Sequence, residues 1–392
     1  MPLLLDLSHT SHTRARTGVQ RVARALRREL APLAAAVCFD PYEGAWRPLE
    51  GWEEENLRAG AAAAGRGARW PLAARVRGLL RRRRRRPREL GGPGAASPDG
   101  ALVPEIFSPG VAAALPGLFA ATAGPRVALF HDAVALQLPE LSPRATVARF
   151  PAYLRELLQF DGVAAVSEGS RESLLGYWRW LGASRTPPVA AVPLGLDPAP
   201  PPGAPPPAAA PPTVLCVGSI EARKNHAALL DACESLWSRG ARFQLHLVGL
   251  ANAETGGPAL ERLERLRRAG RPVRHSGPVG DEALEAAYRE CAFTVYPSFA
   301  EGFGLPVAES LARGKPCLCR TEGALGELAR AGGCLSLGAA GAGEIAAAVA
   351  RLLDSPAELA SLGAAARGRR FRTWADYARD LLAWMGSLRR GA

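Results

Sequence analysis

The sequence predicts an α/β protein built from two Rossmann-like, doubly wound domains that face each other across a cleft. Its 392 residues are too many for one ordinary hydrophobic core and suit two domains of roughly 150 to 200 residues each. Short apolar runs alternate with helical patterns in both halves, which is typical of parallel sheets covered by helices. A proline-rich segment, residues 198–212, predicts a linker between domains 1–197 and 213–370.

The first domain shows this alternation loosely. The apolar runs that predict its strands are "PLLLDLS", "AAVCFD", "ALVPEIF", "RVALFHD" and "GVAAVSE". Residues from about 51 to 100 interrupt the pattern with a stretch rich in alanine, arginine and glycine that carries little strand signal. We interpret this stretch as an insertion, which is expected to be mobile.

The second domain shows the alternation clearly. Its strands are predicted at "TVLCVGS", "FQLHLVG", "AFTVYPS", "KPCLCR" and "GCLSLG", and helical patterns follow them. This order predicts a doubly wound parallel sheet. Because such sheets bind ligands in the crevice outside the carboxyl ends of their strands, the loops at those ends are the candidate site.

Composition restricts the class of protein. Hydrophobic residues make up 48% of the chain and charged residues 22%, as in soluble globular proteins, and no transmembrane stretch is evident, so we expect a cytoplasmic location. The seven cysteines form no C-x-x-C pair and are expected to be buried thiols. The net charge of +12 is concentrated in eleven arginines between Arg66 and Arg88. Such a patch suits nucleic acid, an anionic membrane or an acidic substrate, and charge alone does not choose among them.

Two basic residues follow the first strand of the second domain. In "VLCVGSIEARKNH", Arg223 and Lys224 stand where the next helix begins, and Ser219 lies in the same loop. Cations at this edge of a sheet favour a phosphate site over ordinary solvated charges. No G-x-G-x-x-G follows the strand, which argues against a nicotinamide-dependent oxidoreductase.

The first domain offers weaker candidates. His131 ends the apolar run "RVALFHD" and suits proton transfer, a sugar contact or a purely structural bond. Gly18 begins a helical pattern between basic residues, and one glycine is a weak signal.

The segment "SFAEGFGLPVAE", residues 298–309, places Glu301 and Glu309 on either side of a glycine-rich turn, and Pro306 suits the first turn of a helix. A carboxylate there could simply complement the helix dipole. The functional alternative is an anionic ligand on the free backbone amides, with the glutamates holding hydroxyl groups beside it, as in a nucleotide sugar. The amides concerned are those of Gly302, Phe303, Gly304 and Leu305.

Several chemistries lack their motifs. The chain has no D-x-D, H-E-x-x-H or closely spaced cysteine and histidine pair, so no metal is expected, and it has no G-x-S-x-G of hydrolases. We therefore expect catalysis by positioning and charge, without a cofactor.

The run "YPSFAEGFGLPVAESLARGKP" resembles the E-x7-E signature of retaining glycosyltransferases of the GT-B fold, in the large family four group. Further likeness lies in "VGSIEARKNHAALLDA", in "HDAVALQLPE" and "AVSEGSRESLL", which resemble bacterial mannosyl- and rhamnosyltransferases, and in the closing helix "FRTWADYARDLL". The resemblance implies hexose transfer from a nucleotide-diphosphate sugar to a glycan or lipid-linked acceptor, with retained configuration and no metal. Residues 1–197 would bind the acceptor, residues 213–370 the donor, and 371–392 would cross back to the first domain.

The resemblance also implies roles for single residues. Glu309 would accept hydrogen bonds from the ribose and Glu301 would lie at the donor sugar, beside the amides of Phe303, Gly304 and Leu305. Arg223 and Lys224 would neutralise the departing diphosphate. Gly18 would let the first-domain loop approach it, and His131 would face the sugar from the other side. Two departures from the family pattern stand out: Thr17 and Ser219 occupy positions where many members have glycine and arginine.

Other readings stay open. A phosphorylase or epimerase on the same plan would also use a phosphate cradle, but would explain the two-glutamate segment less well. A nucleic-acid-binding protein would explain the arginines, yet no stacking aromatics are interleaved with them, so no specific nucleic acid is expected. In the insertion, Leu72, Val76, Leu79 and Leu80 share one helical face, and Arg81 to Arg86 follow. This pattern predicts either attachment to the inner face of an anionic membrane or a solvated loop.

Overall fold

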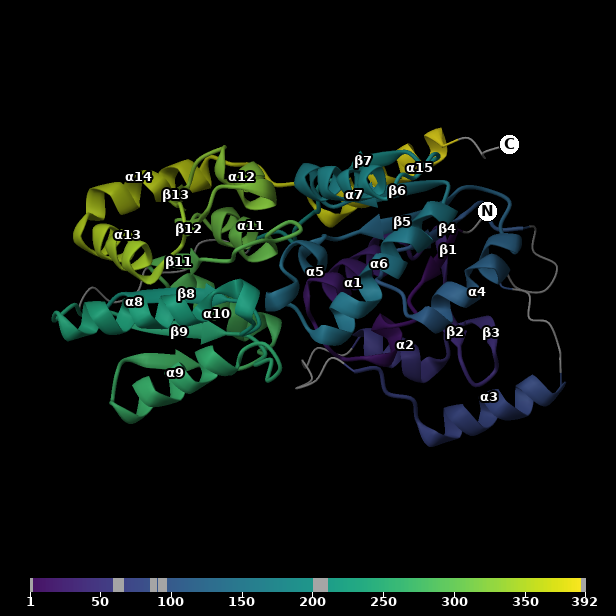
Figure 1. Cartoon of the computed structure of the whole chain (residues 1–392), viewed down its shortest axis with the longest axis horizontal. Helices are drawn as coiled ribbons and strands as arrows, with labels where there is room; N and C mark the ends of the chain where they lie inside the picture. Colours follow the sequence, from purple (N-terminus) through teal and green to yellow (C-terminus); the bar gives the residue numbers. More distant parts are fainter. Residues whose placement is uncertain (1–2, 59–66, 85–89, 91–96, 200–210, 389–392) are drawn as a thin grey trace.

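The computed structural model describes residues 3–58, 67–84, 90, 97–199 and 211–388. Two α/β domains lie end to end along the long axis of the molecule, each with its own sheet (Figure 1). The predicted fold class is confirmed. Most of the proline-rich linker, residues 200–210, lies outside the described residues.

The N-terminal domain contains a seven-stranded sheet in the order β3-β2-β1-β4-β5-β6-β7. Its strands are β1 (Leu3–Asp6), β2 (Ala34–Asp40), β3 (Ala45–Pro48), β4 (Ala101–Val103), β5 (Arg126–Phe130), β6 (Gly162–Ala165) and β7 (Val189–Ala191). Every neighbouring pair is parallel except β2 and β3. β1, β4 and β6 are buried along their whole length, as expected of apolar strands covered on both faces.

The edge strand β3 is a feature that sequence reasoning missed. The chain reverses after β2, where the Asp40 carboxylate accepts hydrogen bonds from the amides of Tyr42 and Glu43 and Gly44 takes a φ of 73°. This tight turn pairs Phe39 with Trp46 in antiparallel register. The sheet is therefore mixed and not wholly parallel.

Helices cover both faces of this sheet. They are α1 (Gly18–Leu30), α2 (Gly51–Arg58), α3 (Leu72–Arg84), α4 (Pro109–Ala120), α5 (Val134–Gln137), α6 (Arg144–Glu156) and α7 (Glu168–Trp180), with short 3-10 turns η1 (Thr10–His12), η2 (Pro139–Leu141) and η3 (Leu157–Gln159). α2 and α3 occupy most of the described part of the predicted insertion, which is therefore largely helical there. α3 lies at the periphery of the domain, below β2 and β3 in Figure 1.

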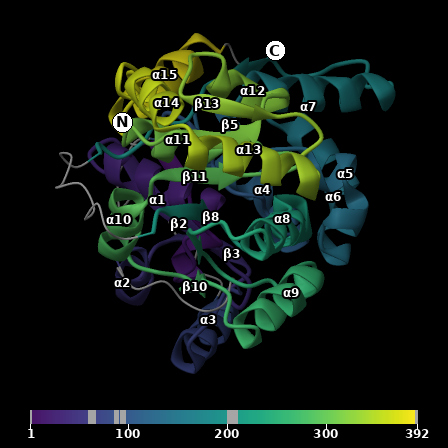
Figure 2. The ribbon, with the colours of Figure 1, turned by 90° about the vertical axis from the view of Figure 1, so that its left-hand side faces the viewer.

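The C-terminal domain contains a wholly parallel six-stranded sheet in the order β10-β9-β8-β11-β12-β13. Its strands are β8 (Thr213–Val217), β9 (Gln244–Val248), β10 (Val273–His275), β11 (Phe293–Tyr296), β12 (Cys317–Arg320) and β13 (Cys334–Leu337). Its helices are α8 (His226–Ser238), α9 (Gly257–Arg268), α10 (Asp281–Glu290), α11 (Leu305–Ala312), α12 (Gly323–Ala329), α13 (Ala342–Asp354) and α14 (Pro356–Arg367), and a 3-10 turn η4 (Ala222–Lys224) precedes α8. Figure 2 shows α8 and α9 on one side of this sheet and α10 and α11 on the other.

The last helix, α15 (Trp374–Ser387), belongs to the N-terminal domain (Figure 1). Thr373 caps it through a capping box with Asp376 and also bridges to Leu196. Tyr377 and Leu381 are buried in the same core as Leu26 of α1. The chain thus crosses between the domains a second time, which ties the C-terminal domain to its partner at two points.

Candidate functional site

A cleft of about 860 Å³ lies between the domains, at the carboxyl ends of strands from both sheets. The N-terminal domain contributes residues 15–28 and the end of β5. The C-terminal domain contributes the loops after β8 and β9 and residues 301–306. Every residue predicted for the site lines this cleft except Glu309, which is buried in α11 behind it. The lining residues predicted from sequence are Gly18, His131, Ser219, Arg223, Lys224, Glu301, Gly302, Phe303, Gly304 and Leu305.

Glu301 lies between the two predicted phosphate-binding cations. Its Oε1 is 2.6 Å from Lys224 Nζ and 3.0 Å from Arg223 Nη1. Burial by itself would raise the pKa of Glu301, but the charges of Arg223 and Lys224 outweigh it and lower the pKa to about 2. Burial lowers the pKa of Lys224, and the charge of Arg223 adds to this effect. Arg223 and Lys224 therefore share one buried carboxylate at the wall of the cleft.

Neighbouring side chains fix these cations in place. Lys224 Nζ donates to the Tyr296 hydroxyl and lies 4.6 Å from the centre of that ring. Arg223 Nε donates to Glu221 across 3.1 Å, and Ser219 donates its hydroxyl to the other Glu221 oxygen at 2.7 Å. Ser219 thus supports the arginine through Glu221 in addition to lining the cleft.

The glycine-rich turn directs the start of α11 toward the cleft. Gly304 is its N-cap, with a φ of 94° that favours glycine, and no side chain caps the helix. Pro306 stands in the first turn, where a proline has no amide to lose. The amide end of α11 is thereby free to face an anion, as is that of α1, whose N-cap Thr17 makes no capping bond.

Gly302 lies in tight contact with the N-terminal domain. A Cβ on this residue would lie 1.9 Å from the carbonyl oxygen of His131, so only glycine fits. Its own carbonyl accepts hydrogen bonds from Ser167 at 2.6 Å and Ser170 at 3.1 Å, both at the start of α7. Sequence reasoning missed the two serines, although they lie in the segment "AVSEGSRESLL". They hold the glycine-rich turn against the N-terminal domain.

Glu309 has partners from both domains. Its Oε1 accepts a bond from Arg21 of α1, and its Oε2 accepts one from the Tyr288 hydroxyl at 3.1 Å. Burial by itself would lower the pKa of Arg21, but the charge and hydrogen bond of Glu309 outweigh burial and raise the pKa above its ordinary value. The carboxylate predicted to bind ribose is therefore held by a cation of the opposite domain in this state.

The two N-terminal candidates are placed differently. His131 is 6% exposed, and its Nε2 donates to the Pro104 carbonyl at 2.7 Å. Burial lowers its pKa, which favours a neutral ring. Gly18 is exposed at the start of α1, and a Cβ there would meet nothing within 4 Å. The fold therefore does not require glycine at this position. A ligand that approaches the backbone closely would require it, because a side chain would block the approach.

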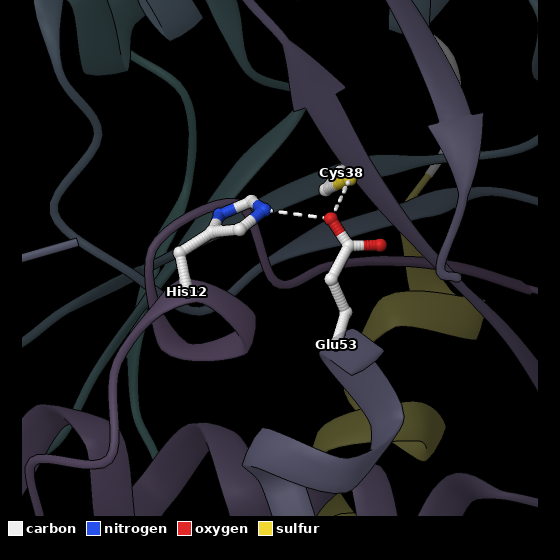
Figure 3. Close-up of side chains that lie close together, drawn as sticks. All are labelled: His12, Cys38 and Glu53. Carbon is white, nitrogen blue, oxygen red and sulfur yellow. Dashed lines mark hydrogen bonds and ion pairs between the residues drawn. The ribbon is translucent and has the colours of Figure 1, made fainter. Parts of the chain in front are cut away.

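A second polar cluster lies inside the N-terminal domain. Figure 3 shows His12, Cys38 and Glu53, whose potential ligand atoms lie within 4.8 Å of one another. His12 Nε2 is 2.7 Å from Glu53 Oε1. Arg47 occupies the other side of the carboxylate, with bonds of 2.7 and 2.8 Å to its two oxygens, and also binds Asp40. Because Arg47 already neutralises Glu53, the cluster is a buried ion-pair network that fastens η1 to α2.

Residues 204–369 match the model of a family described as glycosyl transferases group 1. The serotype-specific mannosyltransferase WbdA of Escherichia coli is 25% identical over 84% of this chain and 40% of its own length. The O-antigen chain mannosyltransferase B of the same organism is 29% identical over 52% of this chain and 54% of its own length. The chain thus spans about half or less of these relatives.

Solved structures extend the likeness to the whole chain. Sucrose-phosphate synthase of Thermosynechococcus elongatus has a TM-score of 0.69 at 19% identity and covers 99% of both chains. HepE of Anabaena, solved with UDP and glucose, has a TM-score of 0.69 at 15% identity and covers 99% of this chain and 100% of its own. The chain has the GT-B fold and is similar to bacterial mannosyltransferases, so the predicted resemblance to GT-B glycosyltransferases is confirmed.

Proposed function

We propose that the protein transfers a hexose, mannose or a rhamnose-like sugar, from a nucleotide-diphosphate sugar to a glycan or lipid-linked acceptor in cell-surface polysaccharide synthesis. The observation that carries this proposal is the placement of two cations, Arg223 and Lys224, in the cleft together with the uncapped amide end of α11. Such a placement suits a leaving diphosphate. The likeness to E. coli mannosyltransferases supports the choice of sugar.

The proposed chemistry is transfer with retained configuration. Cleavage of the bond between sugar and phosphate develops negative charge on the diphosphate, which Lys224, Arg223 and the helix amides are preorganised to stabilise. The donor's ribose would bind Glu309, and its sugar would lie between Glu301 and His131. The leaving phosphate oxygen would take the proton of the acceptor hydroxyl, so that attack and departure share one face of the sugar. No metal is required in this scheme.

A two-stage experiment tests this function. A thermal-shift screen of nucleoside diphosphates and their sugars should identify the donor, since a ligand that binds only the folded state raises the apparent stability. Release of the nucleoside diphosphate should then depend on an acceptor glycan, and NMR should show the donor's anomeric configuration in the product. EDTA should leave the rate unchanged. A rate that requires inorganic phosphate would indicate a phosphorylase instead, and loss of activity in EDTA with recovery on magnesium or manganese would refute the metal-free scheme.

We further propose that α3 holds the enzyme on an anionic membrane. The helix contacts its domain through small residues: Ala74 is buried, and a Cβ on Gly78 would lie 2.8 Å from Tyr42 Cβ. The large apolar residues face the opposite way, with exposed fractions of 47% to 75%. They are Leu72, Val76, Leu79 and Leu80.

The charges beside this apolar face suit acidic lipids. Arg82 and Arg83 are exposed, whereas Arg77 and Arg81 pair with Glu50. Arg85 and Arg86 of the predicted basic run lie outside the described residues. Each arginine near an anionic surface contributes about 1 kcal/mol. In the part of the chain that the structure describes, no helix is long and apolar enough to cross a bilayer.

Liposome sedimentation tests this attachment. The protein should pellet with vesicles that contain anionic lipid but not with neutral ones, and the double variants Leu79→Ser, Leu80→Ser and Arg82→Ser, Arg83→Ser should both stay in the supernatant. Leu33→Ser, which removes another exposed leucine, is the matched control and should still pellet. Equal recovery from both kinds of vesicle would refute the proposal.

A further inference from the structure

The face of α1 that lines the cleft carries four arginines, and most of them form ion pairs with carboxylates. Arg21 pairs with Glu309, Arg27 with Glu54, and Arg28 with Glu29 and Asp197. Arg16, just before the helix, pairs with Asp281 of the opposite domain. These pairs leave one arginine of α1 to account for.

Arg24 is that residue. Its Nη2 donates to two backbone carbonyls, of Thr13 at 2.8 Å and of Asn56 at 3.2 Å, and neither carries a charge. Its Nε and Nη1 are buried and have no hydrogen-bond partner among the described residues. No carboxylate in the described ranges forms an ion pair with it. Glu105 acts on it electrostatically, but that carboxylate is bonded to the amides of His9 and Thr10.

The electrostatics of Arg24 agree with this geometry. Burial and the nearby charge of Arg16 lower the pKa of Arg24 to about 10. Both guanidinium groups line the cleft, and two of the three nitrogens of Arg24 have no hydrogen-bond partner among the described residues. Since donors without acceptors are rare in folded proteins, such an arrangement calls for a negatively charged ligand group.

We propose that Arg24, with Arg16 beside it, binds a phosphate group of the acceptor. This inference rests on the proposed transferase function and adds the class of acceptor: a sugar that carries a phosphate or diphosphate. Arg24 lies six residues after Gly18, or roughly 9 Å along the axis of α1. The acceptor's phosphate would thus bind about that far from the donor's diphosphate, while its hydroxyl reaches the donor sugar.

The domain contact near Arg16 provides access to this site. The Arg16–Asp281 pair joins the loop before α1 to α10, and Asp281 is 81% exposed. An ion pair so exposed contributes little to stability. If the cleft opened, Arg16 would separate from Asp281, and a phosphate that entered beside Arg24 would replace that carboxylate as a partner of Arg16.

Calorimetry with three probes tests the inference. The probes are methyl α-mannoside, mannose 6-phosphate and a mannose linked by a diphosphate to a ten-carbon alkyl chain. Each is titrated into protein that is saturated with the nucleoside diphosphate found in the thermal-shift screen, so that Arg223 and Lys224 are occupied. At least one phosphorylated probe should bind more tightly than the mannoside, and the tighter of the two shows whether the phosphate belongs to a soluble sugar or to a lipid carrier.

Variants assign this preference to Arg24. Arg24→Gln should weaken binding of the phosphorylated probe roughly tenfold or more, the range of a charged hydrogen bond, and leave the mannoside unaffected. Arg24→Lys should retain part of the preference. Arg28→Gln also removes one positive charge, one turn further along α1, and should retain the full preference for the phosphorylated probe. Because Arg24 is unmatched, Arg24→Gln should also fold with unchanged or higher thermal stability.

Three outcomes would overturn the inference: equal binding of all probes to the wild type, an Arg24→Gln variant that keeps the preference, or an equal loss in Arg28→Gln. A wild-type protein that binds no nucleotide at all would instead contradict the proposed function.

Discussion

Substitution of Gly302 by alanine is a sharp test of whether this closed arrangement is the reacting one. The added Cβ would lie 1.9 Å from the His131 carbonyl oxygen, and contacts below 3.0 Å essentially do not occur. The turn must therefore retreat by about 1 Å. This shift would also weaken the hydrogen bonds that the Gly302 carbonyl accepts from Ser167 and Ser170.

The consequence follows from the position of the turn. Glu301 directly precedes Gly302, so the donor side of the cleft moves away from His131. Misplacement by about 1 Å can cost on the order of a hundredfold in rate, and that is the loss of turnover we expect. Donor affinity should change by less than about threefold, because most of the proposed donor contacts belong to the C-terminal domain. Overpacking should lower the free energy of unfolding by about 1 to 3 kcal/mol if the cleft does not open.

The assay is nucleoside diphosphate release at saturating donor and acceptor, with small-angle scattering to detect a wider cleft. Gly176→Ala is the matched control, since Gly176 lies in α7 near the same contact and a Cβ there meets nothing within 4 Å. Wild-type turnover together with an unchanged radius of gyration in Gly302→Ala would refute the reasoning.

Three further variants probe the donor site. Glu309→Ala should weaken donor binding markedly, since it removes the carboxylate proposed to hold the ribose, and unchanged affinity in calorimetry would remove it from the site. Lys224→Ala should lower the single-turnover rate more than it lowers acceptor affinity, because the charge of Lys224 matters most as the diphosphate departs. An effect on acceptor binding alone would contradict this role. The pKa of Glu301 is lowered to about 2 in the folded protein, against about 4.3 in the unfolded chain. The ionised carboxylate therefore stabilises the fold at pH values above about 4.3, and this stabilisation is lost as the pH falls toward 2. Between pH 5 and pH 3, the free energy of unfolding of Glu301→Gln should therefore fall by about 1.5 kcal/mol less than that of the wild type, as measured by urea titration. An equally steep fall in both proteins would contradict this role.

The predictable parts of the site are those encoded locally. Residues 301–309 combine a helix start, a glycine that must take a positive φ and a proline in the first turn, so the short segment alone predicts amides facing an anion. Arg223 and Lys224 were predictable for the same reason, because they follow a strongly apolar strand. The alternation of strands and helices likewise predicts the fold class without any long-range information.

The parts that sequence reasoning missed depend on contacts between distant segments. Ser167 and Gly302 are 135 residues apart, and Arg21 and Glu309 are 288 apart. His12, Cys38 and Glu53 come from three segments with no ligand-like spacing, so their cluster was not evident. Such pairings follow from how two sheets are oriented, which hydrophobic periodicity does not encode.

The Arg21–Glu309 pair suggests how donor binding and closure are coupled. Glu309 has a side chain that is only 5% exposed, so separating it from Arg21 without replacement would leave a buried charge uncompensated. An open cleft would hydrate both groups and would let the ribose of the proposed donor reach the carboxylate. On closure, the diphosphate of the proposed donor would offer Arg21 a new anion, so that one ion pair would replace another.

This exchange makes a prediction for Arg21→Gln. If the donor binds first to the C-terminal domain of an open cleft, away from Arg21, donor affinity should stay within about threefold of the wild type. Closure would lack the cation that meets the diphosphate, and turnover should fall by roughly tenfold or more, the range for a lost charged hydrogen bond. Calorimetry and steady-state rates on the same preparation decide the matter. A large loss of donor affinity with unchanged turnover would mean that Arg21 acts as an ordinary donor contact and that closure does not depend on the exchange.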